Sequence, residues 1–465
     1  MLFRQIVHDD LGCASYLVGD QSAGVAAVVD PKFEIGEYLE LARYFGVSIE
    51  HILETHNHAD HVSGHGRLAA ATGATIHIHR DAAPAYEHAP FDDGFELDLG
   101  AVRVRALHTP GHRPEHTTFA LIDTRRGEEP WAVLTGDSLF VNDIARPDLA
   151  VEKEDGARAI FRSLHEKLLR LAGETEVWPA HLGGSMCGGP AMDMKVASTI
   201  AYERAHNDML EEEDEERFVA RTVSGLGPQP PNFGAIVDLN TGELVTEGVE
   251  VSPLTPRQVE DKRANGAFLV DVRTDLQFDD AHIPGAASIP AVQAGFGTRL
   301  AWLADRDQEI VFVGRDDEDA RRAAKLALAI GVRRFGGYLA GGMTEWRREH
   351  RPVERLERLE LAELPERLEH DPATQVLDVR EHSEWEAGHI PDSRLEPWHD
   401  IHSLPGELDA HQPVAVVCAS GQRAGVAASL LQRYGAREVV HVVNGGVPKW
   451  DDLGHPLTEE EGAAA

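Results

Sequence analysis

The first half of the chain alternates short apolar runs with longer segments whose apolar residues recur at helical spacing. Short runs bounded by turn residues predict strands, and the helical spacing predicts amphipathic helices. The predicted strands cover residues 15–18, 24–29, 49–53, 75–79, 102–107, 117–122 and 131–135, and the predicted helices cover 35–45 and 64–72. This alternation over residues 1–240 predicts an α/β domain.

The second half of the chain repeats itself at an interval of roughly a hundred residues. The sequence Leu-Val-Asp-Val-Arg at 269–273 recurs as Val-Leu-Asp-Val-Arg at 376–380, and His-Ile-Pro at 282–284 recurs at 389–391. A repeat of this length is a domain duplication and not a solenoid. Each copy has the pattern strand, helix, strand, loop, helix, which predicts a parallel α/β sheet.

Composition narrows the class of protein. At 465 residues the chain is too long for one core, and a net charge of −35 argues against a nucleic-acid or anionic-membrane partner. The N-terminus has no apolar signal segment, and no apolar run is long enough for a membrane helix. The three cysteines are too far apart for a disulfide framework, and Cys13 is predicted to be a core residue. We expect a soluble, cytoplasmic protein.

Three histidines and an aspartate lie within six residues directly after the predicted strand 49–53. From position 56 the sequence reads His-Asn-His-Ala-Asp-His. Such groups at a strand end cost free energy unless something binds them. In an extended segment His56 and His58 can direct two ring nitrogens at one ion, while Asp60 and His61 face a neighbouring position. The motif predicts a metal site rather than a solvated surface loop.

Further candidate ligands lie where other predicted strands end. His112 follows the strand 102–107, Asp137 follows the strand 131–135, and His181 follows a short strand at 177–178. The combined set resembles the metallo-β-lactamase superfamily, whose αββα sandwich gathers such loops along one edge of two sheets. The resemblance covers the whole first half of the chain and implies that fold for it.

The superfamily leaves the chemistry open. A complete ligand set can hold two zinc ions and hydrolyse a thioester, as in glyoxalase II relatives. It can also hold one Fe(II) per chain on two histidines and a carboxylate, with open positions for O2 and substrate. In the persulfide dioxygenase branch, which this domain resembles, the iron ligands fall on His56, His112 and Asp137. The remaining four residues would orient the ligands, handle protons or form an alternative metal position: His58, Asp60, His61 and His181. His58 stays open as a fourth ligand.

Two further segments bear on substrate binding. Arg146 lies in a segment that resembles the family's Gly-Arg-x-Asp motif, with Ala145 in place of the glycine. The resemblance implies that Arg146 contacts the carboxylate of a thiol cosubstrate; the alternative is a structural pair with Asp148. The glycine-rich segment 183–189 is expected to line the mouth of the pocket. Its Cys187 either contacts the sulfur substrate or fills a buried position.

The second copy of the repeat has a cysteine directly after its central predicted strand. Cys418 begins the sequence Cys-Ala-Ser-Gly-Gln-Arg-Ala, and a helix follows. A thiol here would lie among backbone N–H groups, at a helix N-terminus and beside Arg423, which favours a thiolate and a bound anion. The Asp-Val-Arg and His-Ile-Pro motifs resemble rhodanese domains, whose active cysteine carries sulfur as a persulfide. The resemblance assigns catalysis to Cys418 and substrate binding to Gly421 and Arg423.

The first copy lacks these groups. Gly314 aligns with Cys418 and Asp319 with Arg423, and residues 315–319 read Arg-Asp-Asp-Glu-Asp. An acidic loop repels sulfite, thiosulfate and persulfide anions. We therefore expect this copy to be inactive in sulfur transfer and to serve as a spacer or docking surface.

The whole arrangement resembles the persulfide dioxygenase–rhodanese fusions of bacterial sulfide detoxification. The expected α/β domains are a metallo-β-lactamase αββα sandwich at 1–240, a linker at 241–253, an inactive rhodanese-like domain at 254–353 and an active one at 354–460. The resemblance implies oxidation of a low-molecular-weight thiol persulfide by O2 to sulfite and free thiol. Sulfur transfer among persulfide, sulfite and thiosulfate would use Cys418. The alternatives are a zinc thioester hydrolase with a rhodanese tail and a sulfur-sensing scaffold, and a homo-oligomer stays open.

Overall fold

The computed structural model describes most of the chain, namely residues 1–8, 10–183, 185–189, 191–292, 295–305 and 307–458. The chain forms two compact units, which we describe separately. The first comprises Met1–Val249 with Ala327–Val332, and the second comprises Glu250–Leu326 with Arg333–Ala465. None of the helices in the described ranges is long and apolar enough to cross a membrane.

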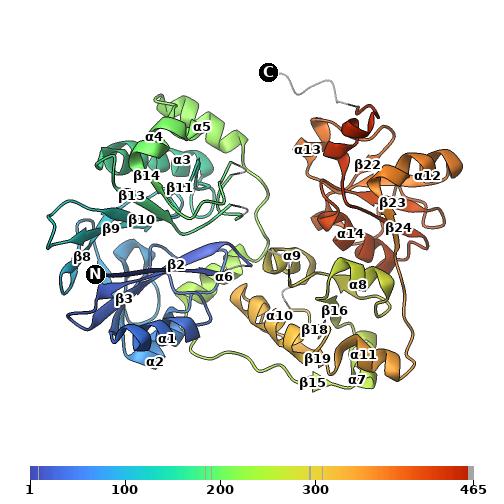
Figure 1. The fold of residues 1–465 in the computed structure, drawn as a ribbon, viewed down its shortest axis with the longest axis horizontal. Coiled ribbons are helices and arrows are strands. Elements are labelled where there is room, and N and C mark those ends of the chain that lie inside the picture. Colours follow the sequence, from blue (N-terminus) through green and yellow to red (C-terminus); the bar gives the residue numbers. More distant parts are fainter. Residues whose placement is uncertain (9, 184, 190, 293–294, 306, 459–465) are drawn as a thin grey trace. The chain divides into compact units, whose positions relative to one another are not determined.

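The first unit contains two six-stranded sheets (Figure 1). The first sheet has the order β1-β2-β3-β4-β5-β6, with β1 Leu2–His8, β2 Cys13–Asp20, β3 Val25–Val29, β4 Ser48–Leu53, β5 Thr75–His79 and β6 Ala89–Phe91. The second has the order β14-β13-β10-β9-β8-β7, with β7 Glu96–Leu99, β8 Val102–His108, β9 Thr117–Asp123, β10 Ala132–Gly136, β13 Glu176–Pro179 and β14 Ser198–Thr199. A small hairpin joins β11 Leu139–Phe140 and β12 Asp143–Ile144.

Six helices accompany these sheets in the described part of the unit: α1 Gly36–Phe45, α2 His65–Thr72, α3 Lys153–Arg162, α4 Ile200–His206, α5 Glu215–Ser224 and α6 Phe233–Thr241. Three apolar clusters separate the layers. One packs α1 and α2 on the first sheet, one fills the space between the sheets, and one packs α3 and α5 on the second sheet. Helix, sheet, sheet and helix layers form the expected αββα sandwich, because each sheet buries both faces.

The strands and helices predicted for this unit are present, with ends that differ by at most two residues. Helix α6 was not predicted. It extends to Thr241, so the segment without regular structure before β15 begins at Gly242. This helix matters for the site because its last turn contacts the His-rich loop.

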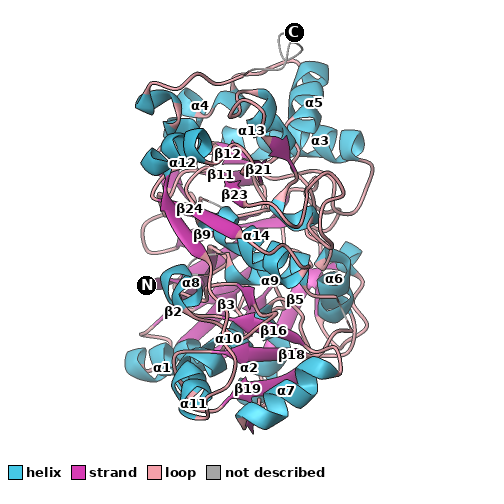
Figure 2. Cartoon of the chain, turned by 90° about the vertical axis from the view of Figure 1, so that its right-hand side faces the viewer, coloured by secondary structure: helices cyan, strands magenta, loops and turns pink. Residues whose placement is uncertain are grey.

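The second unit contains two parallel five-stranded sheets with the same strand order. Figure 2 labels β16, β18 and β19 of the first sheet and β21, β23 and β24 of the second. The first copy comprises β15 Pro253–Leu254, α7 Pro256–Ala264, β16 Phe268–Asp271, α8 Asp275–Asp280, β17 Ala287–Ser288, α9 Phe296–Leu303, β18 Ile310–Val313, α10 Asp317–Ala329, β19 Phe335–Leu339 and α11 Gly342–Arg348. The second comprises β20 Glu357–Glu360, α12 Leu364–His370, β21 Gln375–Asp378, α13 His382–Glu386, β22 Arg394–Leu395, β23 Val414–Val417, α14 Gln422–Arg433 and β24 Val439–Val443.

The repeated Asp-Val-Arg motif has the same structural role in both copies. Arg273 pairs with Asp271 at 2.6 Å and Arg380 with Asp378 at 2.8 Å, and all four side chains are buried. Each arginine also donates to a carbonyl oxygen eight residues further along the chain. The motif therefore fixes the loop after the first long strand of each copy.

Candidate functional site

The His-rich loop follows β4 and is buried along its length, with no residue from 55 to 61 more than 9% exposed. Asp30, directly after β3, accepts hydrogen bonds from the backbone N–H and the hydroxyl of Thr55 at 2.7 and 2.9 Å. Because β3 and β4 are parallel neighbours, these bonds fix the direction in which the loop leaves the sheet.

Asn240, in the last turn of α6, supports the loop from another side. Its side-chain amide donates to the carbonyl oxygens of His58 and His61, each at 2.9 Å, and its Oδ1 accepts from the N–H of Ser63. Nothing in the sequence marked Asn240 as a site residue, since it lies far along the chain in a segment taken as the domain end. A buried asparagine satisfies loop carbonyls that would otherwise lack partners.

Three side chains meet where β4, β8 and β10 end: His56, His112 and Asp137. The Oδ2 atom of Asp137 lies 3.4 Å from Nε2 of His112 and 3.9 Å from Nε2 of His56. All three side chains are at most 1% exposed. Among the described residues these three atoms have no hydrogen-bond partner. Buried polar atoms left without partners are costly, so their convergence fits a bound cation.

The hydrogen bonds of the two Nδ1 atoms fix the tautomer of both imidazoles. Nδ1 of His112 lies 2.9 Å from the carbonyl oxygen of Arg146, which can only accept a hydrogen bond. Nδ1 of His56 lies 2.9 Å from the hydroxyl of Thr55, whose proton goes to Asp30. Both Nδ1 atoms therefore carry the proton, which leaves a lone pair on each Nε2 for a metal.

The electrostatics agree with this assignment. Burial and the neighbouring imidazoles hold the pKa of His56 well below its usual value, and burial lowers the pKa of His112. Burial alone would raise the pKa of Asp137, but the charge and hydrogen bond of His181 hold it at about 2. Two neutral imidazoles and one carboxylate are a donor set that can hold a divalent transition metal ion.

His58 does not share this arrangement. Its Nε2 atom lies 3.2 Å from Asp30 and 3.3 Å from Glu54. Burial opposes protonation, but these two carboxylates hold its pKa well above the usual value. Its Nδ1 atom has no hydrogen-bond partner among the described residues. A ligand role for His58 through Nδ1 stays a prediction.

Asp60, His61 and His181 form a second group with Cys13. His181 lies between two carboxylates, with Nδ1 2.8 Å from Asp137 and Nε2 2.9 Å from Asp60. His61 lies 3.1 Å from Asp60, and Sγ of Cys13 lies 3.0 Å from Asp60 and 3.3 Å from His181. The expected burial of Cys13 is confirmed, but its polar neighbours were not foreseen, because β1–β2 pairing and the β13 loop bring it there.

Arg146 is buried and uses its five N–H groups on protein atoms. Two donate to the carboxylate of Asp148 at 2.7 and 2.9 Å. The others donate to the backbone carbonyl oxygens of Met186, Gly227 and Pro228. These contacts support the structural pair with Asp148. Contact of Arg146 with a cosubstrate stays a prediction.

Cys187 lies beside the candidate metal ligands. Its sulfur and the ligand atoms of Asp137 and His181 all lie within 4.8 Å of one another. Burial holds the pKa of its thiol well above the usual value. A cavity of about 100 Å³ lies beside the segment around Cys187, with Arg146 and Gly188 in its lining. Gly184, in the glycine-rich segment expected at the pocket mouth, lies outside the described residues.

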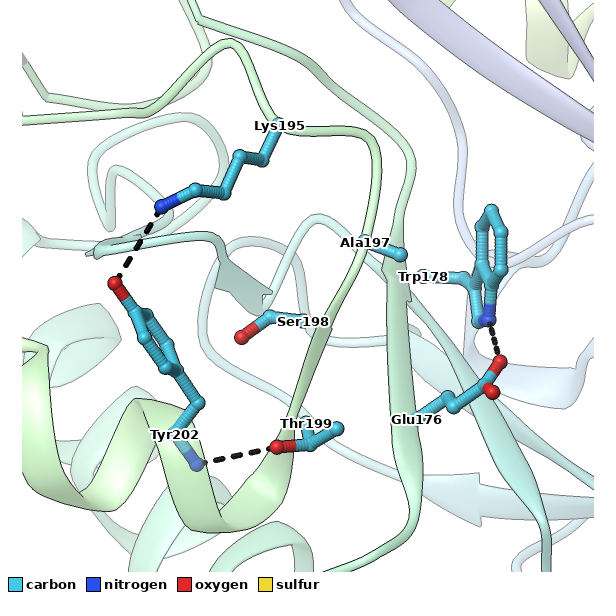
Figure 3. Close-up of a pocket in the computed structure, with 7 residues that line it drawn as sticks. All are labelled: Glu176, Trp178, Lys195, Ala197, Ser198, Thr199 and Tyr202. Atoms are coloured by element: carbon cyan, nitrogen blue, oxygen red, sulfur yellow. Dashed lines mark hydrogen bonds between the residues drawn. The ribbon is translucent and has the colours of Figure 1, made fainter.

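A larger cavity of about 370 Å³ lies at the edge of the second sheet (Figure 3). Trp178 of β13 lines one side and Tyr202 of α4 the other, with Lys195 reaching the Tyr202 hydroxyl at 3.4 Å. None of the candidate metal ligands lines it. We therefore do not assign the reaction to this cavity, although it is larger than the one near Cys187.

In the second unit, Cys418 follows β23 and is buried at 1% exposure. The N–H of Gly421 donates to its sulfur at 3.0 Å. Gly421 adopts a left-handed conformation, with φ 98°, directly before α14. The turn that the sequence predicted therefore presents a backbone donor to the cysteine at a helix N-terminus, where anions are stabilised.

Arg423 is less available than the sequence suggested. Its guanidinium pairs with Glu384 of α13 through two bonds of 2.5 and 2.7 Å. Burial lowers the pKa of Arg423, but this pairing with Glu384 outweighs it and raises the pKa overall. The pair orients the arginine, and Glu384 is a neighbour that sequence analysis missed because it belongs to a different helix.

In the corresponding loop of the first copy, acidic side chains bond to N–H groups and to an arginine of the same loop. The Oδ1 atom of Asp316 accepts from the N–H groups of Glu318 and Asp319 at 2.9 and 3.0 Å. Asp319, at the position of Arg423, pairs with Arg315 at 2.6 Å. A Cβ atom added at Gly314 would lie 2.6 Å from the carbonyl oxygen of Asp316. The loop therefore lacks the nucleophile, and the carboxylate of Asp316 occupies two of its backbone N–H groups.

Comparison with known proteins agrees with this architecture. Residues 8–181 match the metallo-beta-lactamase superfamily, and residues 255–349 and 360–453 each match the rhodanese-like domain. The chain is 28% identical over 182 residues to a mitochondrial persulfide dioxygenase, ETHE1, of Homo sapiens, covering 39% of this chain and 68% of that protein. It is 36% identical over 169 residues to a hydroxyacylglutathione hydrolase of Methylococcus capsulatus, covering 36% and 60%.

Two further similarities extend over larger shares of the relatives. A probable metallo-hydrolase of Burkholderia pseudomallei is 30% identical over 240 residues, covering 44% of this chain and 80% of that protein. The crystal structure of a metallo-beta-lactamase from Staphylococcus aureus matches with a TM-score of 0.65 and 29% identity, covering 73% of this chain and 99% of that one. The chain belongs to the metallo-β-lactamase superfamily. It joins such a domain, similar to persulfide dioxygenases, to two rhodanese-like domains.

Proposed function

We propose that the protein is an Fe(II)-dependent persulfide dioxygenase with sulfurtransferase activity at Cys418. The observation that carries the proposal is the set of three buried, unpartnered ligand atoms on His56, His112 and Asp137, in one chain with an intact rhodanese cysteine. The similarity to persulfide dioxygenases supports the same reaction. The substrate would be a low-molecular-weight thiol persulfide, with O2 as oxidant.

Fe(II) in this site would supply adjacent binding positions for the persulfide sulfur and O2. In the overall reaction R–S–SH, O2 and water give R–SH, sulfite and two protons. The terminal sulfur is oxidised, O2 is reduced and the S–S bond breaks. The protein's part is to orient the imidazoles through the carbonyl of Arg146 and the hydroxyl of Thr55. His181 holds protons on both ring nitrogens between Asp60 and Asp137, close to the reacting groups.

Sulfur transfer uses a separate chemistry. The Cys418 thiolate attacks the outer sulfur of thiosulfate, the S–S bond breaks, and sulfite leaves with the bonding electron pair. The resulting Cys418 persulfide passes its sulfur to a thiol acceptor, or the steps run in reverse. The Gly421 N–H, 3.0 Å from the sulfur, stabilises negative charge there.

A zinc thioester hydrolase is the second candidate, favoured by the complete second ligand group and by the similarity to a hydroxyacylglutathione hydrolase. The atoms of that group are already hydrogen-bonded to one another and to Cys13. By contrast, the Nε2 atoms of His56 and His112 and the Oδ2 atom of Asp137 lack hydrogen-bond partners among the described residues. This contrast supports one metal ion over two.

The test combines metal analysis with two activity assays on the full chain. Loaded with Fe(II) without oxygen, the protein should hold one iron per chain, consume O2 on glutathione persulfide and release sulfite. His112→Ala should abolish O2 uptake. His108→Ala is the matched control, because His108 ends β8 directly before the loop of His112 and does not belong to the set of His56, His112 and Asp137. Stoichiometric zinc, hydrolysis of S-lactoylglutathione and no O2 uptake would establish the hydrolase instead.

A further inference from the structure

The two rhodanese copies meet along helix α14, which begins directly after the Cys418 loop. Its residues from 424 to 431 are all buried, because the helix lies between its own sheet and the first copy. The hydroxyl of Ser429 accepts from the N–H of Ser288, and His282 lies 2.9 Å from Gln432. The copy without a cysteine is therefore packed against the helix that carries the active loop.

One buried chain of hydrogen bonds crosses this boundary and ends in the loop. Asp279, on α8 of the first copy, lies 2.9 Å from Nδ1 of His441 on β24 of the second copy. Nε2 of His441 lies 2.8 Å from the carbonyl oxygen of Gly421. Since a carbonyl can only accept, Nε2 carries its proton and donates it to Gly421. The two side chains are 2% and 0% exposed, so water does not compete for these bonds.

Gly421 joins this chain to the cysteine. Its carbonyl oxygen accepts from His441, while its N–H donates to the sulfur of Cys418. Both groups flank the α-carbon of Gly421, which has a left-handed φ of 98°. Because glycine has no side chain, only these backbone contacts restrain its orientation. Holding the carbonyl fixes the peptide orientation on one side and thereby the direction of the N–H on the other.

The arrangement is specific to the active copy. Strand pairing puts His441 opposite Val416, and in the first copy it puts Tyr338 opposite Phe312. A Cβ atom on Gly425 would lie 2.8 Å from the His441 ring, so α14 has a glycine where the imidazole needs room. The acidic residue that corresponds to Asp279 in the second copy, Glu386, is exposed.

We propose that the cysteine-less copy positions the catalytic loop of its neighbour, with Asp279 as a positioning residue that acts on Cys418 through His441 and Gly421. The proposal rests on the proposed sulfur transfer at Cys418. It replaces the spacer role expected from the sequence with a contribution to catalysis. Without Asp279, His441 loses the partner that orients its ring, and the Gly421 N–H is no longer held toward the sulfur.

The structure supplies a matched pair of variants. Asp279 and Asp275 both pair with Arg358, at 2.7 and 3.3 Å, but only Asp279 contacts His441. In the full chain, Asp279→Asn should lower kcat for sulfite release from thiosulfate about tenfold, the effect of replacing a charge-assisted hydrogen bond by a weaker neutral one. KM should stay unchanged. Asp275→Asn should keep the wild-type kcat. Alkylation of Cys418 by iodoacetamide should slow in parallel with kcat.

A double-mutant cycle separates positioning from stability. In a His441→Phe background, which already lacks both bonds, Asp279→Asn should cause no further fall in kcat. A purely structural Asp279 would instead lower the melting temperature and the rate in both backgrounds. Wild-type kcat in Asp279→Asn, or an equal fall in Asp275→Asn, would overturn the proposal. If Asp279→Asn fails to fold, a wild-type kcat in the single variant His441→Phe would overturn the proposal. A wild-type chain without sulfurtransferase activity would refute the proposed function instead, and O2 uptake in each variant reports the state of the first unit.

Discussion

A cysteine placed in the first rhodanese copy should not create a second sulfurtransferase. The change is Gly314→Cys, made in a Cys418→Ser background so that any activity must come from the new thiol. A Cβ atom at position 314 would lie 2.6 Å from the carbonyl oxygen of Asp316, 2.9 Å from Cβ of Asp319 and 3.0 Å from the N–H of Ala320. Two of these are backbone atoms, so the loop must shift, at a cost of about 1–3 kcal/mol.

The loop also offers fewer backbone donors to an anion. The carboxylate of Asp316 already occupies the N–H groups of Glu318 and Asp319. In the second copy, by contrast, a backbone N–H of this turn, that of Gly421, donates to the sulfur of Cys418. Loss of one such donor lowers rates by a factor of about 10²–10³ in oxyanion sites. We therefore expect thiosulfate sulfurtransferase activity at least about a hundredfold below that of the unmodified chain.

The assay is sulfite release from thiosulfate with a thiol acceptor, together with thermal unfolding to show that the second unit is folded. A companion variant adds Asp316→Ser and Asp319→Arg, which frees the N–H groups and restores a cation. It should recover part of the activity. Activity of the single Gly314→Cys change within about tenfold of the unmodified chain would refute this reasoning, since neither the overlap nor the occupied donors would then matter.

Four further changes test other parts of the site. Asp137→Ala should lower iron content and O2 uptake by about 100-fold or more, because it removes the single carboxylate of the ligand set; metal analysis and an oxygen electrode measure both. Cys418→Ser should keep O2 uptake on glutathione persulfide and abolish sulfite release from thiosulfate; loss of O2 uptake in a folded, iron-loaded variant would contradict the separation of sites. Arg146→Met should destabilise the first unit by about 3 kcal/mol, since Asp148 loses its ion-pair partner and keeps the hydrogen bond from Gln229; a raised KM with unchanged stability would instead assign Arg146 to substrate binding. Glu384→Gln should cost at most about 1 kcal/mol at neutral pH, because the pair is partly exposed. Burial opposes ionisation, but Arg423 lowers the pKa of Glu384, so the difference between wild type and variant should vanish as pH falls below 4.5.

The sequence by itself determined the elements and the residue types of both sites. Strands such as β4 and β23 are short apolar runs that end at a polar motif, and periodicity is a local property that needs no knowledge of the fold. The ligands His56, His112 and Asp137 each follow a strand end, so the expectation that they meet follows once the ends of strands from both sheets lie along one edge of the sandwich. The absence of a cysteine from the first rhodanese copy was likewise visible from Gly314, and the acidic residues after it predict that this copy is inactive.

Only the tertiary structure decided which groups these residues contact. Cys13 was foreseen as buried, yet its contacts with Asp60 and His181 depend on the pairing of distant strands. Asn240 in an unpredicted helix holds the metal loop, and Glu384 holds Arg423. The bond between Asp279 and His441 spans 162 residues of sequence. Sequence periodicity reports that a side chain is buried, whereas the partner of a buried polar group is set by packing between segments that no local pattern connects.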